Sequence, residues 1–167
     1  MRVFKENQRF TQWWLLFLLT LVAVIILKAV FEETKGFKEA ENPLFILFIV
    51  FAGLIPIVLL LGIQLQTRID AKGITVKFHP LGFTKKHFTW NEILDCYVTQ
   101  YSPIREYGGW GIRGLGKKKA YNVSGNLGIQ IVTRDKKRFL IGTRQPEAVK
   151  AVLATYQKKL KLNTQYL

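Results

Sequence analysis

The sequence has a single cysteine, Cys96, which excludes a framework of internal disulfides and fits a reducing compartment. Its two histidines, His79 and His87, have no cysteine or second histidine at the spacing that a metal site needs. Acidic residues are scarce, with 11 Asp and Glu against 25 Lys and Arg, and no acid–base pair or nucleophile stands out. The sequence therefore predicts a protein that is not an enzyme, and we expect neither a cofactor nor a metal.

Charged side chains are almost missing from two long stretches. Residues 13–31 contain one charge, Lys28, and residues 43–65 contain none. A helix of about 20 apolar residues crosses the hydrocarbon core of a bilayer. The remaining chain, about 100 residues, is too short to enclose two helices that are apolar on every face. We therefore expect residues 1–65 to form a transmembrane hairpin, with helices at about 11–31 and 43–65.

The charges beside these helices predict their orientation. Three basic residues precede the first helix, and Arg68 and Lys72 closely follow the second. The intervening loop, residues 32–42, holds four glutamates and two lysines. Lys and Arg are enriched in cytoplasmic flanks. We expect a multi-pass protein of the inner or plasma membrane with both termini in the cytoplasm.

Residues 66–167 form a separate and strongly basic segment. They hold 19 of the 25 Lys and Arg but six of the 11 Asp and Glu. Apolar residues recur with a period of two, as at Ile74, Val76 and Phe78, and this indicates half-buried strands. Turn residues separate seven such stretches. The predicted strands are 64–69, 74–78, 86–90, 94–101, 119–123, 127–133 and 138–142.

The last part of this segment has the period of a helix. Pro146 suits a first helical turn, and Glu147 complements the helix dipole there. Apolar residues then lie on one face, at Val149, Val152, Leu153, Tyr156 and Leu160. We expect residues 66–167 to form a cytoplasmic α+β domain, an antiparallel barrel or sandwich of about seven strands capped by a C-terminal helix.

Seven strands followed by a helix is the element order of the pleckstrin-homology-like (PH-like) fold. Three stretches carry a closer resemblance: Tyr-Ser-Pro-Ile-Arg-Glu-Tyr-Gly-Gly-Trp-Gly-Ile-Arg at 101–113, Ala-Tyr-Asn-Val-Ser-Gly-Asn at 120–126, and Phe-Leu-Ile-Gly-Thr at 139–143 with Pro146-Glu147 after it. In these stretches the chain resembles a group of small bacterial membrane proteins that join two helices to a bacterial PH-like domain. The resemblance implies this architecture. It carries over no catalytic residue, and lipid binding by some eukaryotic PH domains does not transfer with it.

The most distinctive motif is the glycine-rich stretch 107–116. Residues 109–114 match the dinucleotide pattern G-x-G-x-x-G, but three lysines and a strand follow where such a site needs a helix. Residues 111–117 match the spacing of a phosphate loop, but Lys118 stands where a Ser or Thr would bind magnesium. Neither kind of nucleotide site is predicted.

Two interpretations of this stretch stay open. It can be a structural loop whose glycines permit positive φ angles. It can also be a ligand or partner site, because glycines let a group approach the backbone while Arg and Lys bind anions. The candidate binding residues are Arg105, Tyr107, Trp110, Arg113, Lys117, Lys118 and Lys119.

Positive charge is the broadest signal, since residues 66–167 carry nearly all of the net charge of +14. Anionic headgroups attract a basic surface by about 1 kcal/mol for each nearby Lys or Arg. Nucleic acid is the weaker candidate partner, because the chain has no recognised nucleic-acid motif and is expected to be tethered to a membrane. The charge can also serve topology and solubility alone.

These observations predict a non-enzymatic, membrane-anchored PH-like binding module that contacts a protein partner, the anionic inner-leaflet surface, or both. The alternative is an accessory subunit of a membrane complex whose contacts are made through the transmembrane hairpin. An enzyme would instead show a deep pocket with convergent titratable groups.

Overall fold

The computed structural model describes residues 3–10, 12–33, 43–114 and 116–164. The chain forms two compact units, which we call the β unit and the helical unit. The β unit comprises residues 1–9 and 63–167, and the helical unit comprises residues 10–62. The helical unit is therefore inserted in the chain of the β unit, between Arg9 and Ile63.

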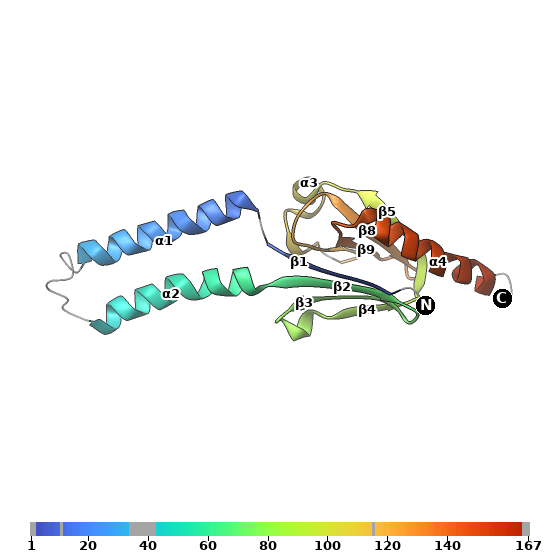
Figure 1. The fold of residues 1–167 in the computed structure, drawn as a ribbon, viewed down its shortest axis with the longest axis horizontal. Coiled ribbons are helices and arrows are strands. Elements are labelled where there is room, and N and C mark those ends of the chain that lie inside the picture. Colours follow the sequence, from blue (N-terminus) through green and yellow to red (C-terminus); the bar gives the residue numbers. More distant parts are fainter. Residues whose placement is uncertain (1–2, 11, 34–42, 115, 165–167) are drawn as a thin grey trace. The chain divides into compact units, whose positions relative to one another are not determined.

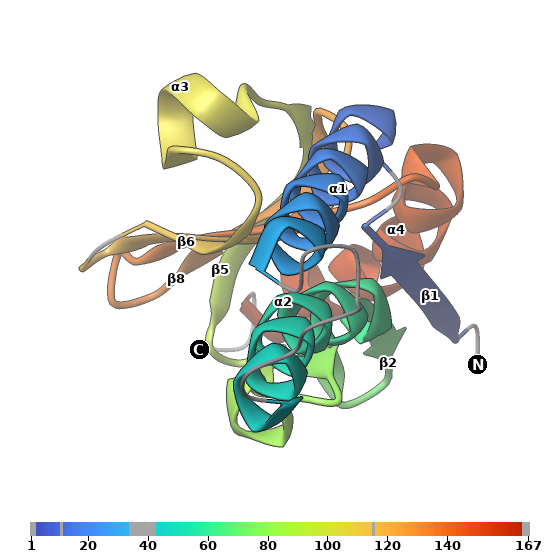
Figure 2. The ribbon, with the colours of Figure 1, turned by 90° about the vertical axis from the view of Figure 1, so that its left-hand side faces the viewer.

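The helical unit consists of α1 (Trp13–Glu33) and α2 (Pro43–Gly62), which lie side by side (Figures 1 and 2). Both predicted helices are thus present as helices. A Cβ atom on Gly53 of α2 would lie 2.3 Å from Ile26 Cδ1 of α1, so the glycine permits this close approach. By length and composition α1 is able to cross a membrane. Residues 34–42, most of the loop predicted to lie outside the cell, are not among the described residues.

Sheet A of the β unit is antiparallel, with strand order β1-β2-β3-β4 (Figure 1). Its strands are β1 (Phe4–Arg9), β2 (Gln64–Asp70), β3 (Gly73–His79) and β4 (Lys86–Thr89).

Strand β1 lies within residues 1–65, the range that the sequence assigns to the hairpin. The structure pairs β1 with β2 over six residues, from Phe4 opposite Ile69 to Arg9 opposite Gln64. An alternating apolar signal is missing here because two of the three inward-facing residues, Glu6 and Gln8, are polar. The tail before the first helix is therefore an edge strand of sheet A.

Sheet B has the strand order β5-β8-β9-β7-β6. Its strands are β5 (Ile93–Gln100), β6 (Gly111–Arg113), β7 (Lys118–Asn122), β8 (Leu127–Thr133) and β9 (Arg138–Gly142). The prediction of a wholly antiparallel fold is wrong at one pair, because β7 and β9 run parallel. The cause is that β9 turns back from β8 and lies between β8 and β7. A period of two locates strands but does not say which strands pair.

All seven predicted strands are confirmed to within one residue at each end. The predicted C-terminal helix is confirmed as α4 (Pro146–Thr164), and the class is α+β. Besides β1, the sequence misses β6, the short helix α3 (Pro103–Tyr107) and the single turn η1 (Gly82–Thr84). These three elements are too short for a periodic pattern to develop.

Two aromatic contacts join the parts of the β unit. Phe88 of β4 and Phe139 of β9 bring sheet A against sheet B, with ring centroids 4.7 Å apart. Trp90, just after β4, stacks on Tyr156 of α4 at 5.0 Å. Around these contacts the two sheets and α4 bury an apolar core, in which each fully buried large side chain contributes about 1.5–3 kcal/mol. Its members include Leu65, Ile69, Ile74, Val76, Ile129, Ile131, Leu140, Ile141, Val149 and Leu153. The side chain of Leu160, predicted on the same helical face, is outside the described part.

Candidate functional site

The outer face of sheet A carries basic and polar side chains from all four strands. Cross-strand pairing aligns Lys5, Arg68, Thr75 and His87 in one row across the sheet. A neighbouring row contains Asn7, Gln66 and Lys77, and Lys85 precedes β4 beside it. With the β2–β3 turn these rows line a groove of about 850 Å³, which we call the basic groove. Its lining residues are Lys5, Asn7, Gln66, Thr67, Arg68, Asp70, Lys72, Thr75, Lys77, Lys85 and His87.

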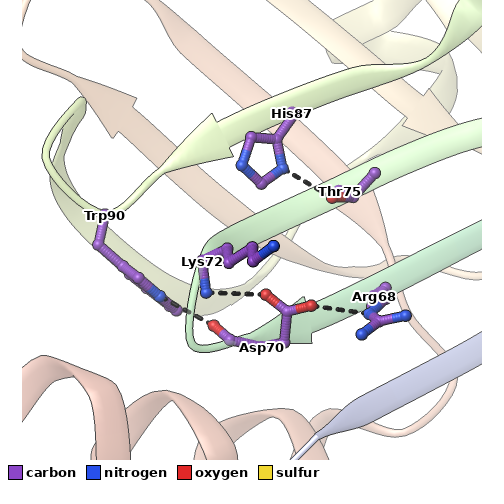
Figure 3. Close-up of polar contacts among 6 residues, drawn as sticks. All are labelled: Arg68, Asp70, Lys72, Thr75, His87 and Trp90. Carbon is purple, nitrogen blue, oxygen red and sulfur yellow. Dashed lines mark hydrogen bonds and ion pairs between the residues drawn. The ribbon is translucent and has the colours of Figure 1, made fainter.

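The basic groove has five cationic side chains and one carboxylate. The carboxylate, Asp70, accepts hydrogen bonds from the Lys72 backbone N–H at 2.9 Å and from Arg68 Nε at 2.7 Å (Figure 3). The Lys72 N–H first of all, and then Arg68, lower the pKa of Asp70 against the opposing effect of desolvation. Among the residues that the structure describes, Lys5, Lys77 and Lys85 form no ion pair. The groove therefore presents unneutralised positive charge.

The end of the groove at the β2–β3 turn is held by further contacts. The indole Nε1–H of Trp90 donates to the backbone carbonyl of Asp70 at 2.9 Å (Figure 3). The same indole stacks on Tyr156, so the turn is connected to α4. Thr75 Oγ1 and His87 Nδ1 are 2.7 Å apart. The polar groups at this end are thus fixed before any ligand arrives, which reduces the entropy lost on binding.

The seven candidate residues of the glycine-rich stretch occupy several elements. Arg105 and Tyr107 belong to α3 and Arg113 to β6, while Lys118 and Lys119 begin β7 and Lys117 directly precedes it. Trp110 lies between α3 and β6 and is partly buried. The cationic side chains among them are all exposed.

Lys118 and Tyr107 are one pair of these residues that the structure brings together. Lys118 Nζ lies 4.7 Å from the ring centroid of Tyr107 and 3.6 Å from Glu106 Oε2. Tyr107 itself is buried and meets the ring of Tyr101 edge-on at 5.9 Å. Burial, followed by the charge of Glu106, raises the pKa of Tyr107 to about 12. Tyr107 therefore has a packing role in the β unit.

Arg113 folds back on its own loop, where its Nε donates to the carbonyl of Trp110 at 2.8 Å. Two glycines have a backbone reason to be present. Gly108 ends α3 at φ 73° and donates to the carbonyl of Ile104 at 2.9 Å. At Gly114, with φ 90°, an added Cβ would lie 2.2 Å from the carbonyl oxygen of Lys118. Both glycines are compatible with either interpretation of the stretch.

A smaller cleft of about 330 Å³ lies between β4 and the β8–β9 turn. Its two carboxylates are already engaged. Glu92 Oε2 accepts the backbone N–H of Thr89 at 3.0 Å, and Asp135 pairs with Lys137 at 2.6 Å. The Lys137 side chain above all lowers the pKa of Asp135 to about 2. Neither carboxylate is poised to exchange a proton near neutral pH.

The other carboxylates of the β unit are also engaged in polar contacts. Each carboxylate that the structure describes there accepts a hydrogen bond or forms an ion pair, and the set is Glu6, Asp70, Glu92, Asp95, Glu106, Asp135 and Glu147. Because cations far outnumber these acids, the surplus positive charge is left for solvent or for an anionic partner.

Sequence reasoning missed the basic groove. Its lysines are spread from Lys5 to Lys85, and only the pairing of β1 with β2 brings the first of them onto the face. Strand alternation places Arg68, Thr75 and Lys77 on a common outward face. That part of the groove was accessible from the sequence, whereas the contribution of β1 was not.

The fold and the groove define an α+β protein in which a basic sheet face accompanies an apolar pair of helices. A scan against protein-family models finds no match to the chain, and a search of curated proteins finds none.

Proposed function

We propose that this chain is a non-enzymatic, membrane-anchored binding module of PH-like fold whose basic groove binds anionic headgroups of the inner leaflet. One observation carries the proposal. Three lysines that form no ion pair within the described residues come from separate segments of the chain and line one groove. A phosphate or phosphodiester group is the complementary ligand, because Lys and Arg bind it by charge and hydrogen bonds.

The exposed surface of the helical unit supports membrane anchoring. Phe17 and Leu27 of α1 are each 65% exposed, and Phe48 and Val58 of α2 are 67% and 66% exposed. So many large apolar side chains on one pair of helices require lipid or a partner around them. In the proposal, α1 and α2 cross the bilayer as a hairpin and both termini are cytoplasmic.

A PH-like assignment is supported by the element order. Two packed sheets precede a C-terminal helix, α4, whose Tyr156 reaches the β4–β5 turn through Trp90. The additional strands β1 and β6 lie at the outer edges of their sheets. Removing these edge strands leaves seven strands and a helix, the number and order of the proposed fold.

The alternative, an accessory subunit that makes its contacts through the helices, also has an observation in its favour. An apolar cavity of about 240 Å³ lies between α1 and α2 at Gly53. Small residues at such positions let helices pack closely in membranes, and a side chain of a third helix could enter there. A protein partner at the glycine-rich stretch is compatible with either function.

The test is binding of the full chain, held in nanodiscs of phosphatidylcholine, to sedimenting vesicles. The isolated segment 66–167 is unsuitable because it lacks β1. We expect binding to vesicles that contain phosphatidylglycerol at low salt, with loss at high salt as the charges are screened. We expect little binding to vesicles of phosphatidylcholine alone. If wild-type protein binds both vesicles equally, or neither, the proposal is wrong.

Two triple variants with the same change in net charge locate the surface. Lys5→Gln, Lys77→Gln and Lys85→Gln together should weaken binding by about tenfold or more, since each nearby lysine contributes about 1 kcal/mol. Lys117→Gln, Lys118→Gln and Lys119→Gln together should weaken it much less. Equal losses would show attraction to net charge with no preferred groove.

A further inference from the structure

Strand β1 presents a different chemistry on each of its faces. Lys5 and Asn7 point outward and line the basic groove. Phe4, Glu6 and Gln8 point inward and are buried, with Glu6 4% and Gln8 1% exposed. Since only one of the three inward side chains is apolar, apolar burial holds β1 in place less strongly than it holds β2 or β3.

Polar contacts across the sequence compensate for this. The hydroxyl of Thr143 donates to Glu6 Oε2 at 2.7 Å, and the backbone N–H of Arg144 donates to Glu6 Oε1 at 2.8 Å. We call these three residues the Glu6 lock. Thr143 and Arg144 lie between β9 and α4, so the lock joins the first strand of the chain to its last strand and helix.

The hydrogen bonds around the lock show which of its groups donate and which accept. Thr143 Oγ1 accepts the backbone N–H of Gln145 at 3.1 Å, so its own proton is available for Glu6. Glu6 therefore serves as the acceptor on both oxygens. A buried carboxylate is tolerated only while such donors replace its hydration. Loss of the lock consequently favours transfer of Glu6, and β1 with it, to water.

Two neighbouring contacts reinforce the same junction. Gln8 Nε2 donates to the carbonyl of Gly142 at 2.7 Å. Arg144 reaches the carbonyl of Arg9 through Nη2 at 3.4 Å and the hydroxyl of Ser124 through Nε at 2.9 Å. The contacts extend along β1 from Glu6 to Arg9, the residue after which the chain enters the helical unit.

We propose that Glu6 is a positioning residue of the basic groove: the lock keeps β1 in sheet A, and so keeps Lys5 and Asn7 in the groove. This inference rests on the proposed function for its ligand, an anionic headgroup. It makes the occupancy of the groove depend on a buried contact on the opposite face of β1.

The direction in which binding changes when the negative charge of Glu6 is removed tests this inference. Glu6→Ala raises the net charge by one, so simple attraction predicts tighter binding of nanodisc-held protein to phosphatidylglycerol vesicles. The lock predicts the opposite, binding roughly tenfold weaker. Glu147→Ala is the matched control, because it makes the same charge change at an exposed carboxylate paired with Lys150, and it should bind as wild type or slightly more tightly. If the Glu6→Ala protein binds the vesicles as tightly as the Glu147→Ala protein, or more tightly, the proposal is wrong.

A covalent rescue separates positioning from general loss of structure. Arg9 and Gln64 are cross-strand partners outside the groove lining, so Arg9→Cys with Gln64→Cys can fix β1 to β2 by a disulfide. In the Glu6→Ala background, the oxidised pair should restore binding, and reduction should abolish it again. If Glu6→Ala does not fold, Glu6→Gln, which keeps the size and one acceptor, is compared with its own oxidised form. Binding that stays weak after oxidation overturns the proposal.

Amide hydrogen exchange distinguishes failure of this inference from failure of the proposed function. Glu6→Ala should accelerate exchange at residues 4–9 while leaving β3 and β9 protected. If wild type does not bind vesicles, the proposed function fails, and exchange alone then decides whether the lock retains β1. Unchanged exchange at residues 4–9 overturns the inference even if vesicle binding is strong.

Discussion

Arg9 and Gln64 are paired across β1 and β2, and the whole helical unit lies between them in the chain. The chain therefore leaves the β unit and returns to it at neighbouring points of one sheet. If α1 crosses a membrane, α2 has to bring the chain back to the side where β1 already lies. In the proposed topology this relationship is the reason to expect two crossings, and it does not depend on the flanking charges.

The first prediction concerns topology. With both ends of the helical unit joined to one folded unit, Phe37→Cys should face the outside and Lys136→Cys the cytoplasm. In intact cells, an impermeant thiol reagent should label position 37 strongly and position 136 only after the membrane is opened. Labelling at 136 but not at 37 would show the opposite orientation. Labelling at both positions in intact cells would be incompatible with a hairpin whose ends are joined by the pairing of β1 and β2.

The single native cysteine is a suitable background for that experiment. Cys96 is buried in β5, and burial, with a smaller effect of Asp95, raises the pKa of its thiol to about 12. We predict that wild-type protein resists thiol reagents until it is unfolded, because the thiolate is the reactive form. Labelling of native wild-type protein as fast as at an engineered exposed cysteine would contradict this.

The same pKa predicts a pH dependence of stability. The folded chain keeps the thiol proton up to a higher pH than the unfolded chain does. The contribution of the protonated thiol to folding stability is therefore fully present below about pH 9 and is lost as the pH rises toward 12. The difference in unfolding free energy between wild type and Cys96→Ala should fall by about 1 kcal/mol from pH 7 to pH 10. A difference that grows over this range would have the wrong sign.

The sequence predicts the β unit well where side chains alternate and poorly where they do not. The seven predicted strands have such alternation or clear turn residues between them, and their bounds are right to within one residue. Strand β1 carries Glu6 and Gln8 at inward positions, and the hydrogen-bond partners that make this possible, at residues 142–144, are more than a hundred residues away. Polar burial of this kind is invisible to any local pattern.

The candidate site, too, has a part that the sequence predicts and a part that it does not. Arg105, Arg113 and the three lysines at 117–119 are exposed cations, as a local motif suggests, but Tyr107 packs against Tyr101. The basic groove depends on the register of four strands. Lys5 and Lys85 enter it only through pairings that a single sequence does not specify.

Two glycines of the glycine-rich stretch provide a matched pair for stability. Gly114→Ala should destabilise the β unit by more than about 1 kcal/mol, because its φ is 90° and the new Cβ would lie 2.2 Å from a backbone oxygen. Gly116→Ala should cost less, since φ is 59° and no heavy atom lies within 4 Å of the new Cβ. Thermal unfolding in detergent measures both. Equal losses would mean that the contact with Lys118 does not constrain the loop.

The last prediction concerns the loop surface itself. Trp110 and Arg113 are residue types that dominate the energetics of protein interfaces, and the exposed side chains of Ile104 and Ile112 lie in the same segment of the chain. We predict that Trp110→Ala with Arg113→Ala abolishes capture of a protein partner in mild detergent while thermal stability is retained. The proteins lost by this double variant should be ones that both the wild-type chain and the triple lysine variant of the basic groove still capture.

A control that also replaces one large apolar residue and one arginine by alanine is available on another part of the β unit. Leu94→Ala with Arg134→Ala removes one exposed apolar side chain and one exposed arginine, and it should leave capture unchanged. If the Trp110 and Arg113 variant instead loses several kcal/mol of stability, as a buried aromatic does when truncated, the loop is structural. Arg113 donates to the backbone carbonyl of Trp110, so Arg113→Ala alone separates the two cases. A structural loop should unfold earlier without that bond, whereas a binding surface should lose capture at unchanged stability.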